Sequence, residues 1–321
     1  MPLGHESNIP ARIGVRRRLV ATLYALLALA VLAGCGSDSA ADPDARPEPS
    51  QARFDAGRAF ADLEAQVAIG PRPSGSAASR ETAELIATRL REAGADGVAI
   101  QEPHLNVVGR IGDGDGAIVV GAHHDTKDDA GEDFVGANDG ASGVAVVLEL
   151  ARVLEPVAGG PAIHFALFDA EEARGDRPFT EDGTRGSRQY VRYAERGAQG
   201  SPPLDGIEAM VLFDMVGDCD LQIPLEANSD PALYERFAVA ARELSADGSA
   251  APFEGEAGGI LDDHIPFAEA GVSAVDLIDF TYGPGGSPGA WWHTPDDDLE
   301  KVCPESLAAV GEPAVVAIEG I

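Results

Sequence analysis

Residues 118–125 of this chain read IVVGAHHD, a run of apolar residues that ends in two histidines and an aspartate. Residues 165–172 (FALFDAEE) and residues 210–214 (MVLFD) repeat the arrangement, with acidic side chains where the apolar run stops. Short apolar runs of this kind are typical of strands buried on both faces. The sequence therefore predicts several buried strands, each ending in side chains that can bind a metal ion or carry a proton.

Segments with helical periodicity alternate with these strands along the chain. The patterns predict helices over 56–68, 79–93, 142–154, 185–195, 230–244 and 304–318, and strands over 106–111, 117–121, 162–168, 207–213 and 272–278. This alternation favours a mostly parallel sheet covered by helices on both faces. No internal repeat and no break in composition divides residues 53–321, so we expect one α/β domain with a mixed, mostly parallel central sheet.

Composition excludes several classes of protein. The 321 residues include 23 Lys and Arg against 54 Asp and Glu, a formal net charge of −31. A chain this acidic lacks the basic face that follows nucleic-acid phosphates. With 45% hydrophobic residues it is not a disordered acidic tail, and three cysteines do not make a disulfide scaffold.

The amino-terminal residues read as an export signal. Arginines at 12 and 16–18 precede an apolar run over 19–33, which is too short to cross a bilayer comfortably and suits a signal peptide. The run ends in Leu32-Ala33-Gly34-Cys35, which resembles the lipobox of bacterial lipoproteins. An ordinary signal peptide that happens to contain a cysteine is the alternative.

This resemblance implies a lipoprotein signal peptide over 1–34 and an acylated Cys35. Residues 35–52 are then a flexible tether, because residues 36–52 are rich in Ser, Asp and Pro and lack apolar periodicity. We expect an exported protein, lipid-anchored to the outer face of a membrane or to the cell envelope. Cys219 and Cys303 could pair in such an oxidising compartment, but the sequence does not fix their distance and leaves the pairing open.

Charged side chains gathered at strand ends call for a cation. In open α/β sheets ligands bind outside the carboxyl ends of the strands, and carboxylates crowded there repel one another unless something neutralises them. Histidine and carboxylate ligands without cysteine suggest zinc, as one ion or two. Alternation along the strand places His123 and Asp125 on one side and His124 on the other. We therefore predict His123 as a ligand and Asp125 as a residue that orients a ligand.

Taken together, the motifs resemble those of the co-catalytic zinc aminopeptidases and, within that clan, the zinc-dependent glutaminyl cyclases. The resemblance covers residues 55–318 and implies the phosphorylase/hydrolase-like fold of those enzymes. The motifs that carry it are 121–125 (GAHHD), 139–143 (DGASG), 168–173 (FDAEEA), 186–188 (GSR), 213–217 (FDMVG), 262–267 (DDHIPF) and 292–294 (WHT). Each motif is weak alone, and their order and spacing make the set specific.

In the aminopeptidases the matching positions hold two zinc ions. The resemblance implies that His123 and Asp214 bind one ion, Glu172 and His293 bind the other, and Asp139 bridges them. Glu171 would then be the general base.

In the animal glutaminyl cyclases the positions of Asp139, Glu172 and His293 hold a single zinc ion. The resemblance then gives Glu171 the role of proton shuttle. It places Asp214 and Asp262 in an acidic hydrogen-bond network with Glu171.

Three features favour the cyclase interpretation. Asp262 stands where aminopeptidases usually have Ser, Trp292 stands where they commonly have Tyr, and the insertion at 174–185 is similar to a cyclase loop. Trp292 would wall a slot for a glutamine side chain. Against this, Arg177 stands about where cyclases place a pocket Trp. His123 and Asp214 are also both present, so a second metal ion is not excluded.

We therefore predict a monomeric glutaminyl-peptide cyclotransferase, an aminoacyltransferase that converts the N-terminal Gln of peptides to pyroglutamate with one zinc ion. The first alternative is an aminopeptidase hydrolase with two zinc ions that removes N-terminal residues from peptides. The second alternative is a non-catalytic peptide-binding lipoprotein of the cell surface.

Several polar residues have a plainer interpretation. We expect the acidic residues at 128, 129 and 296–298 to be solvated surface groups. His124 and His264 are expected to be structural or to support the site, and Trp291 is compatible with core or pocket.

Overall fold

The computed structural model describes residues 52–246 and 248–321. The predicted signal peptide, Cys35 and almost all of the predicted tether therefore lie outside the described residues. Within the described part of the chain, no helix is both long enough and apolar enough to cross a membrane.

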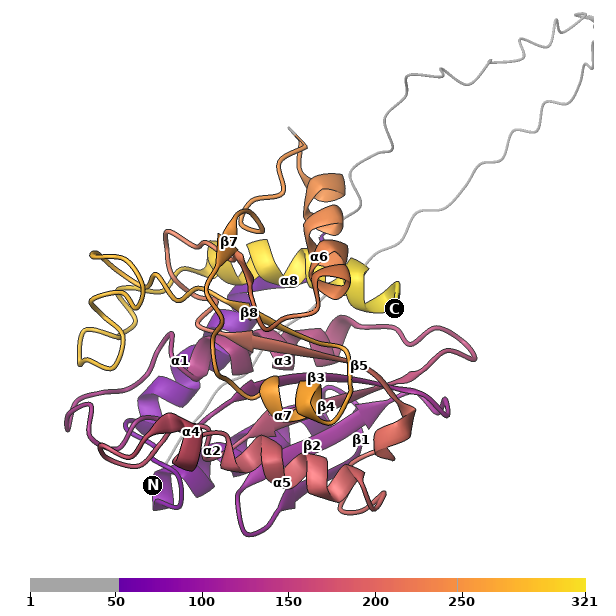
Figure 1. Ribbon diagram of the computed structural model, residues 1–321, viewed down its shortest axis with the longest axis horizontal. Coiled ribbons are helices and arrows are strands. Elements are labelled where there is room, and N and C mark those ends of the chain that lie inside the picture. Colours follow the sequence, from indigo (N-terminus) through magenta and orange to yellow (C-terminus); the bar gives the residue numbers. More distant parts are fainter. Residues whose placement is uncertain (1–51, 247) are drawn as a thin grey trace, which may run out of the picture. The chain divides into compact units, whose positions relative to one another are not determined.

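A six-stranded sheet forms the centre of the domain (Figure 1). Its strands are β1 (Asp96–Gln101), β2 (Asn106–Ile111), β3 (Ala117–His123), β4 (Ala162–Phe168), β5 (Ile207–Asp214) and β8 (Ala274–Ile278). They lie in the order β1-β2-β4-β3-β5-β8. The pairs β4–β3, β3–β5 and β5–β8 are parallel, whereas β1–β2 and β2–β4 are antiparallel. The prediction of a mixed, mostly parallel sheet is confirmed.

Helices cover both faces of the sheet. They are α1 (Ala56–Ile69), α2 (Ala77–Glu92), α3 (Ala141–Val153), α5 (Arg185–Ala194), α6 (Pro231–Leu244), α7 (Ile265–Glu269) and α8 (Pro304–Glu319), with a short α4 (Phe179–Asp182). The larger core packs α1, α2, α3, α6 and α8 against one face. A smaller core packs α5 and α7 against the other face, where Figure 1 shows them side by side.

The strands divide their side chains between these two cores. In β3, Ile118 and Val120 join the larger core, whereas Val119 joins the smaller one. Both sets are almost completely buried, which explains why the strand sequence is continuously apolar rather than alternating.

Sequence patterns did not predict β1 or the two-residue strands β6 (Leu225–Glu226) and β7 (Glu256–Ala257). β1 lies at the edge of the sheet, reads DGVAIQ and is largely exposed, so it lacks the apolar run that marks the central strands. The predicted helices and central strands are present with bounds shifted by one or two residues.

A glycine at the start of α3 brings this helix close to the end of β5. A Cβ on Gly143 would lie 2.1 Å from the carbonyl oxygen of Phe213, so only glycine allows this approach. The approach sets the loop before α3, which contains Asp139, beside the residue that ends β5, Asp214.

A disulfide joins Cys219 to Cys303, with 4.9 Å between the Cα atoms and a sequence separation of 84. It ties the segment after β5 to the residue that precedes α8. The pairing that the sequence left open is therefore made in the structure.

Candidate active site

The predicted site residues converge at the carboxyl ends of three neighbouring strands. His123 is the last residue of β3 and Asp214 the last of β5, while Glu171 and Glu172 follow the end of β4. Asp139 lies in the loop before α3. His293 comes from the segment between β8 and α8, and Asp262 from the segment just before α7.

Two groups of three side chains meet around Asp139. Nε2 of His123 lies 3.1 Å from Oδ1 of Asp139 and 3.2 Å from Oδ1 of Asp214. Nε2 of His293 lies 3.3 Å from Oδ2 of Asp139 and 3.0 Å from Oε1 of Glu172. We call His123, Asp139 and Asp214 the buried triad, and Asp139, Glu172 and His293 the open triad.

The chemistry of these residues fits a metal ion. Within each triad the candidate ligand atoms lie within 4.8 Å of one another, and all are nitrogen or oxygen. The two oxygens of Asp139 are divided between the triads, as a bridging carboxylate requires. Oδ2 of Asp139 is buried without a hydrogen-bond donor. A divalent cation would neutralise this cluster of carboxylates.

The two histidines take up part of that negative charge. Burial lowers the pKa of His293, but interaction with the carboxylates of Asp139 and Glu172 outweighs it and raises the pKa to about 10. The pKa of His123 also lies well above its usual value because Asp214, Asp125 and Asp139 outweigh its burial. Protons and metal ions therefore compete for these nitrogens.

Unusual backbone conformations aim the side chains into the site. Ala170, Met215 and His293 have φ values of 63°, 49° and 52°, in the left-handed region. Such a residue costs about 1–3 kcal/mol and persists only where its surroundings enforce it. Ala170 turns the chain directly before the glutamate pair, so Glu171 and Glu172 both face the pocket beyond β4.

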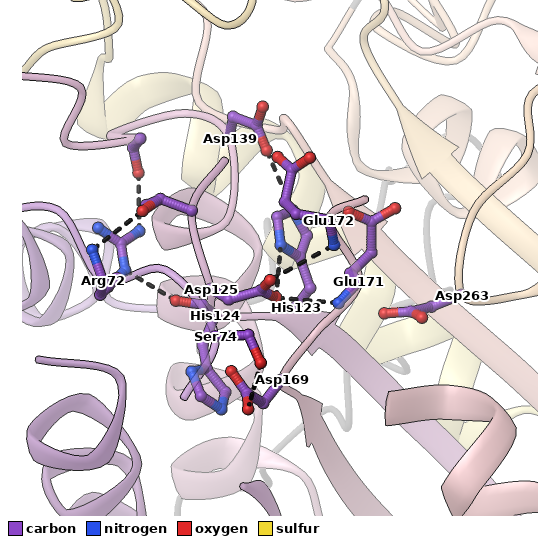
Figure 2. Close-up of polar contacts among 12 residues, drawn as sticks. Arg72, Ser74, His123, His124, Asp125, Asp139, Asp169, Glu171, Glu172 and Asp263 are labelled. Atoms are coloured by element: carbon purple, nitrogen blue, oxygen red, sulfur yellow. Dashed lines mark hydrogen bonds and ion pairs between the residues drawn. The ribbon is translucent and has the colours of Figure 1, made fainter. Parts of the chain in front are cut away.

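The side chain of Asp125 supports the glutamate pair by accepting hydrogen bonds from its main-chain amides. The amides of Glu171 and Glu172 donate to the two oxygens of Asp125, over 3.0 and 3.4 Å, as Figure 2 shows. Oδ1 of Asp125 also lies 3.7 Å from Nδ1 of His123. The structure thus places Asp125 where it can orient both a candidate ligand and the candidate base.

Glu171 lies in a setting that favours its protonated form. Burial, together with repulsion from Glu172 and Asp262, holds the pKa of Glu171 well above its usual value. The pKa of Asp262 is raised for the same reason, by burial and by repulsion from Asp214 and Asp263. This cluster therefore holds a shared proton to a higher pH than isolated carboxyl groups would.

The cluster opens into a pocket of about 480 Å³. Glu171, Asp214, Asp262 and the open triad line its floor, whereas His123 is not among the lining residues. Trp292 forms part of the wall, stacked on His293 with ring centroids 3.8 Å apart. The volume lies in the usual range for small-molecule sites, about 300–1,000 Å³.

The prediction that Asp297 is a solvated surface residue is wrong. Asp297 is fully buried, and it accepts hydrogen bonds from the amides of Asn138 (2.7 Å) and Asp139 (3.0 Å) and from the hydroxyl of Tyr282 (2.7 Å). It therefore fixes the loop that carries the shared Asp139. Its sequence context, three consecutive aspartates, gave no sign of this.

Arg72 is a second residue that the sequence analysis missed, because it lies in a Gly-Pro-Arg-Pro stretch that reads as a helix breaker. Its guanidinium is fully buried and donates to the carbonyls of His124 (2.8 Å), Gly136 (2.9 Å) and Val135. It joins the loop after β3 to the loop before Asp139. Figure 2 shows it to the left of Asp125, on the side of the site away from Asp263, and the carboxylates of Asp297, Asp139 and Asp125 favour its positive charge.

The two remaining histidines of the motifs point away from the triads. Nε2 of His124 lies 3.2 Å from the carbonyl oxygen of Leu105. His264 is fully buried between Glu226 (3.4 Å from Nε2) and Asp276 (3.7 Å from Nδ1). Both are packed within the protein, and neither lines the pocket.

A model of peptidase family M28 matches residues 106–318. The aminopeptidase YwaD of Bacillus subtilis is 30% identical over 193 residues, which cover 57% of this chain and 37% of that protein. The glutaminyl-peptide cyclotransferase of Drosophila melanogaster is 29% identical over 212 residues, which cover 58% of this chain and 55% of that protein. The matches thus span only about a third to a half of these relatives.

Solved structures match over most of the domain. A glutaminyl cyclase of Porphyromonas gingivalis has a TM-score of 0.71 and 28% identity, covering 84% of this chain and 99% of its own. A Zn-dependent exopeptidase of Parabacteroides distasonis has a TM-score of 0.70 and 26% identity, again covering 84% and 99%. Both kinds of enzyme therefore share this fold.

Proposed function

The chain belongs to peptidase family M28, and from that premise we propose that it is a zinc-dependent glutaminyl-peptide cyclotransferase. It would convert an N-terminal glutamine of peptides or proteins to pyroglutamate and release ammonia. Relatives and structural neighbours of this chain include enzymes with the name glutaminyl-peptide cyclotransferase or glutaminyl cyclase.

The observation that carries this proposal is the buried carboxylate of Asp262 on the floor of the pocket that Glu171 and Asp214 also line. Cyclisation requires one proton to leave the attacking amine and one to reach the leaving nitrogen. A group of close, buried carboxylates with raised pKa values can hold such a proton and return it.

The residues would act in the following way. Zinc, when bound, supplies Lewis-acid polarisation of the glutamine γ-carbonyl. As the α-amine forms its bond to the side-chain amide carbon, Glu171 accepts a proton from the amine. Glu171 then passes this proton to the amide nitrogen, the bond from carbon to that nitrogen breaks, and ammonia leaves. Repulsion from Glu172 and Asp262 makes the ionised Glu171 a stronger proton acceptor, and Trp292 walls the slot for the side chain.

We propose that the open triad holds a single zinc ion. Asp139, Glu172 and His293 all line the pocket, so an ion held there would face a substrate. Support for zinc comes from the nitrogen and oxygen donors and from a neighbour that is a Zn-dependent exopeptidase.

A second candidate function, zinc aminopeptidase, has its own observation. The buried triad is complete and shares Asp139 with the open triad, which is the arrangement that two ions would need. With two ions, Glu171 would act as general base toward water in hydrolysis of the first peptide bond.

We also propose that residues 1–34 are removed on export, that Cys35 is acylated, and that residues 53–321 act as a monomeric catalytic domain behind a tether at 35–52. The disulfide between Cys219 and Cys303 supports export, because disulfides persist mainly in oxidising compartments. Mass spectrometry of the mature protein from its native membrane checks this. An intact residue 1 or an unmodified Cys35 would contradict it.

Mass spectrometry of a peptide that begins Gln-Leu, incubated with the purified protein and zinc, tests the activity. We expect loss of one ammonia and retention of every residue. Loss of the whole first residue would instead establish the aminopeptidase. An unchanged peptide would contradict both activities and favour a protein that only binds peptides.

A further inference from the structure

The charged side chains that line the pocket are sorted by depth. The carboxylates on the floor are Asp139, Glu171, Glu172, Asp214 and Asp262, and all are buried. The remaining charged lining residues, apart from the triad residue His293, are Lys127 and Arg177. Negative charge therefore lies on the buried lining residues, and positive charge lies on Arg177 of the loop at 174–185 and on Lys127, which contacts that loop.

Lys127 binds the start of that loop through hydrogen bonds to main-chain carbonyls. Its Nζ donates to the carbonyls of Ala173 and Gly175 (2.7 Å for the latter) and pairs with Asp129 at 2.9 Å. Only 12% of its side chain is exposed. The charge of Lys127 is thus largely balanced by groups of the protein itself.

Arg177 is the exposed cation of the wall, with 59% of its side chain accessible. It lies 3.1 Å from Asp182, but Asp182 also binds Arg174 through two side-chain bonds and Arg185 through one, so three guanidiniums share a single carboxylate. Asp182 orients Arg177 and cannot neutralise all three. Of these arginines, only Arg177 lines the pocket.

A peptide bound at the floor leaves the pocket past its exposed lining residues, and Arg177 is one of them. In the proposed reaction the α-amine and the side chain of the first residue both react at the floor, beside Glu171. The second and third residues then extend toward solvent, at about 3.3–3.6 Å per residue. Exposed lining residues such as Arg177 and Leu261 stand at that outer end.

We propose that Arg177 selects substrates with an acidic side chain, Asp or Glu, at the second or third position after the N-terminal glutamine. This inference rests on the proposed function and names its substrate class. A guanidinium recognises a carboxylate through paired hydrogen bonds, so the contact would add direction as well as charge.

The surrounding acidic groups do not cancel this effect. Asp128 and Asp129 lie beside Lys127, and Asp176 and Glu181 lie on the same loop as Arg177, but none of them lines the pocket. The net charge of the whole chain disfavours acidic peptides, yet that field is screened beyond about 8–10 Å at physiological salt. The test must therefore separate the charge at the pocket from the charge of the protein.

The test uses two variants of equal charge change in the full chain, Arg177→Gln and the control Arg196→Gln. Arg196 is exposed and does not line this pocket. For each protein, kcat/KM is measured for Gln-Glu-Ala-Phe and Gln-Lys-Ala-Phe, for the same pair with the charge at position three, and for neutral Gln-Ala-Ala-Phe. The readout is the ratio of the acidic to the basic peptide.

We expect Arg177→Gln to lower that ratio by about two- to fivefold, the range for an exposed ion pair, and Arg196→Gln to leave it unchanged. Arg177→Glu should lower the ratio further, and raising the salt concentration should shrink both shifts. An unchanged ratio in both Arg177 variants, or an equal shift in Arg196→Gln, would overturn the inference alone. If no glutamine peptide is cyclised by the unmodified protein, the proposed function fails and the inference fails with it.

Discussion

The two triads share Asp139 but differ in their access to solvent. In the buried triad the side chain of His123 is 2% exposed, whereas in the open triad the side chain of His293 is 21% exposed. His123 comes from the end of a central strand, and His293 comes from a long connecting segment, where it stacks on Trp292. An ion in the open triad can therefore meet a substrate, while the buried triad is better placed to support it.

Removing one histidine at a time should separate the two triads most strongly. With a single zinc in the open triad, His293→Asn should reduce bound zinc from one per chain to nearly none and abolish turnover, because the ion loses its only nitrogen ligand there. His123→Asn should keep the zinc. Elemental analysis of the purified variants measures this. Two zinc ions in the unmodified protein, with one lost in His123→Asn, would instead favour the aminopeptidase.

Glu171 tests whether the chemistry can be separated from the metal sites. Replacing it with Gln should lower kcat by about 10²–10⁴-fold, the usual contribution of a general acid–base group, without changing zinc content. Steady-state kinetics with a Gln-Leu peptide measures the loss. Glu181→Gln, an exposed carboxylate outside the pocket, is the matched control. Full activity in Glu171→Gln would refute the assigned proton transfer.

Replacing Asp297 tests whether its hydrogen bonds to the loop that carries Asp139 support both triads. Because it accepts from the amides of Asn138 and Asp139, Asp297→Asn should loosen the bridging carboxylate and weaken zinc binding by about 10–100-fold. Competition with a chromogenic chelator measures the affinity. The exposed neighbour Asp296, replaced by Asn, should leave zinc affinity unchanged. Equal effects of the two substitutions would show that Asp297 has no special role.

The disulfide should have the smallest effect on the chemistry. It joins the segment that follows Asp214, of the buried triad, to the segment that follows His293, of the open triad. Replacing both Cys219 and Cys303 with Ser should lower the free energy of unfolding by about 2–4 kcal/mol, since a long loop is no longer closed in the unfolded chain. Urea denaturation measures the change. If the double variant unfolds at the same urea concentration as the unmodified protein, the crosslink does not form.

Sequence patterns were sufficient for the parts of the fold that depend on local periodicity. The apolar runs of β3, β4 and β5 predicted buried strands. The polar residues that follow them predicted the edge of the sheet where the site lies. The edge strand β1 was missed because it is half exposed and carries no such run. Resemblance to a family then selected which of the polar residues to group together.

The sequence by itself thus determined the class of fold, the family and the residues that could bind a metal ion. The contacts between distant segments came from the folded structure alone: the two oxygens of Asp139 face different histidines, Asp297 accepts from the amide of Asp139, Arg72 joins the loop after β3 to the loop before Asp139, and Cys219 reaches Cys303. The physical reason is distance along the chain. Periodicity reports only which face of its own element a residue occupies, whereas these contacts join different elements, from 16 to 158 residues apart in sequence, whose approach depends on the packing of the whole sheet.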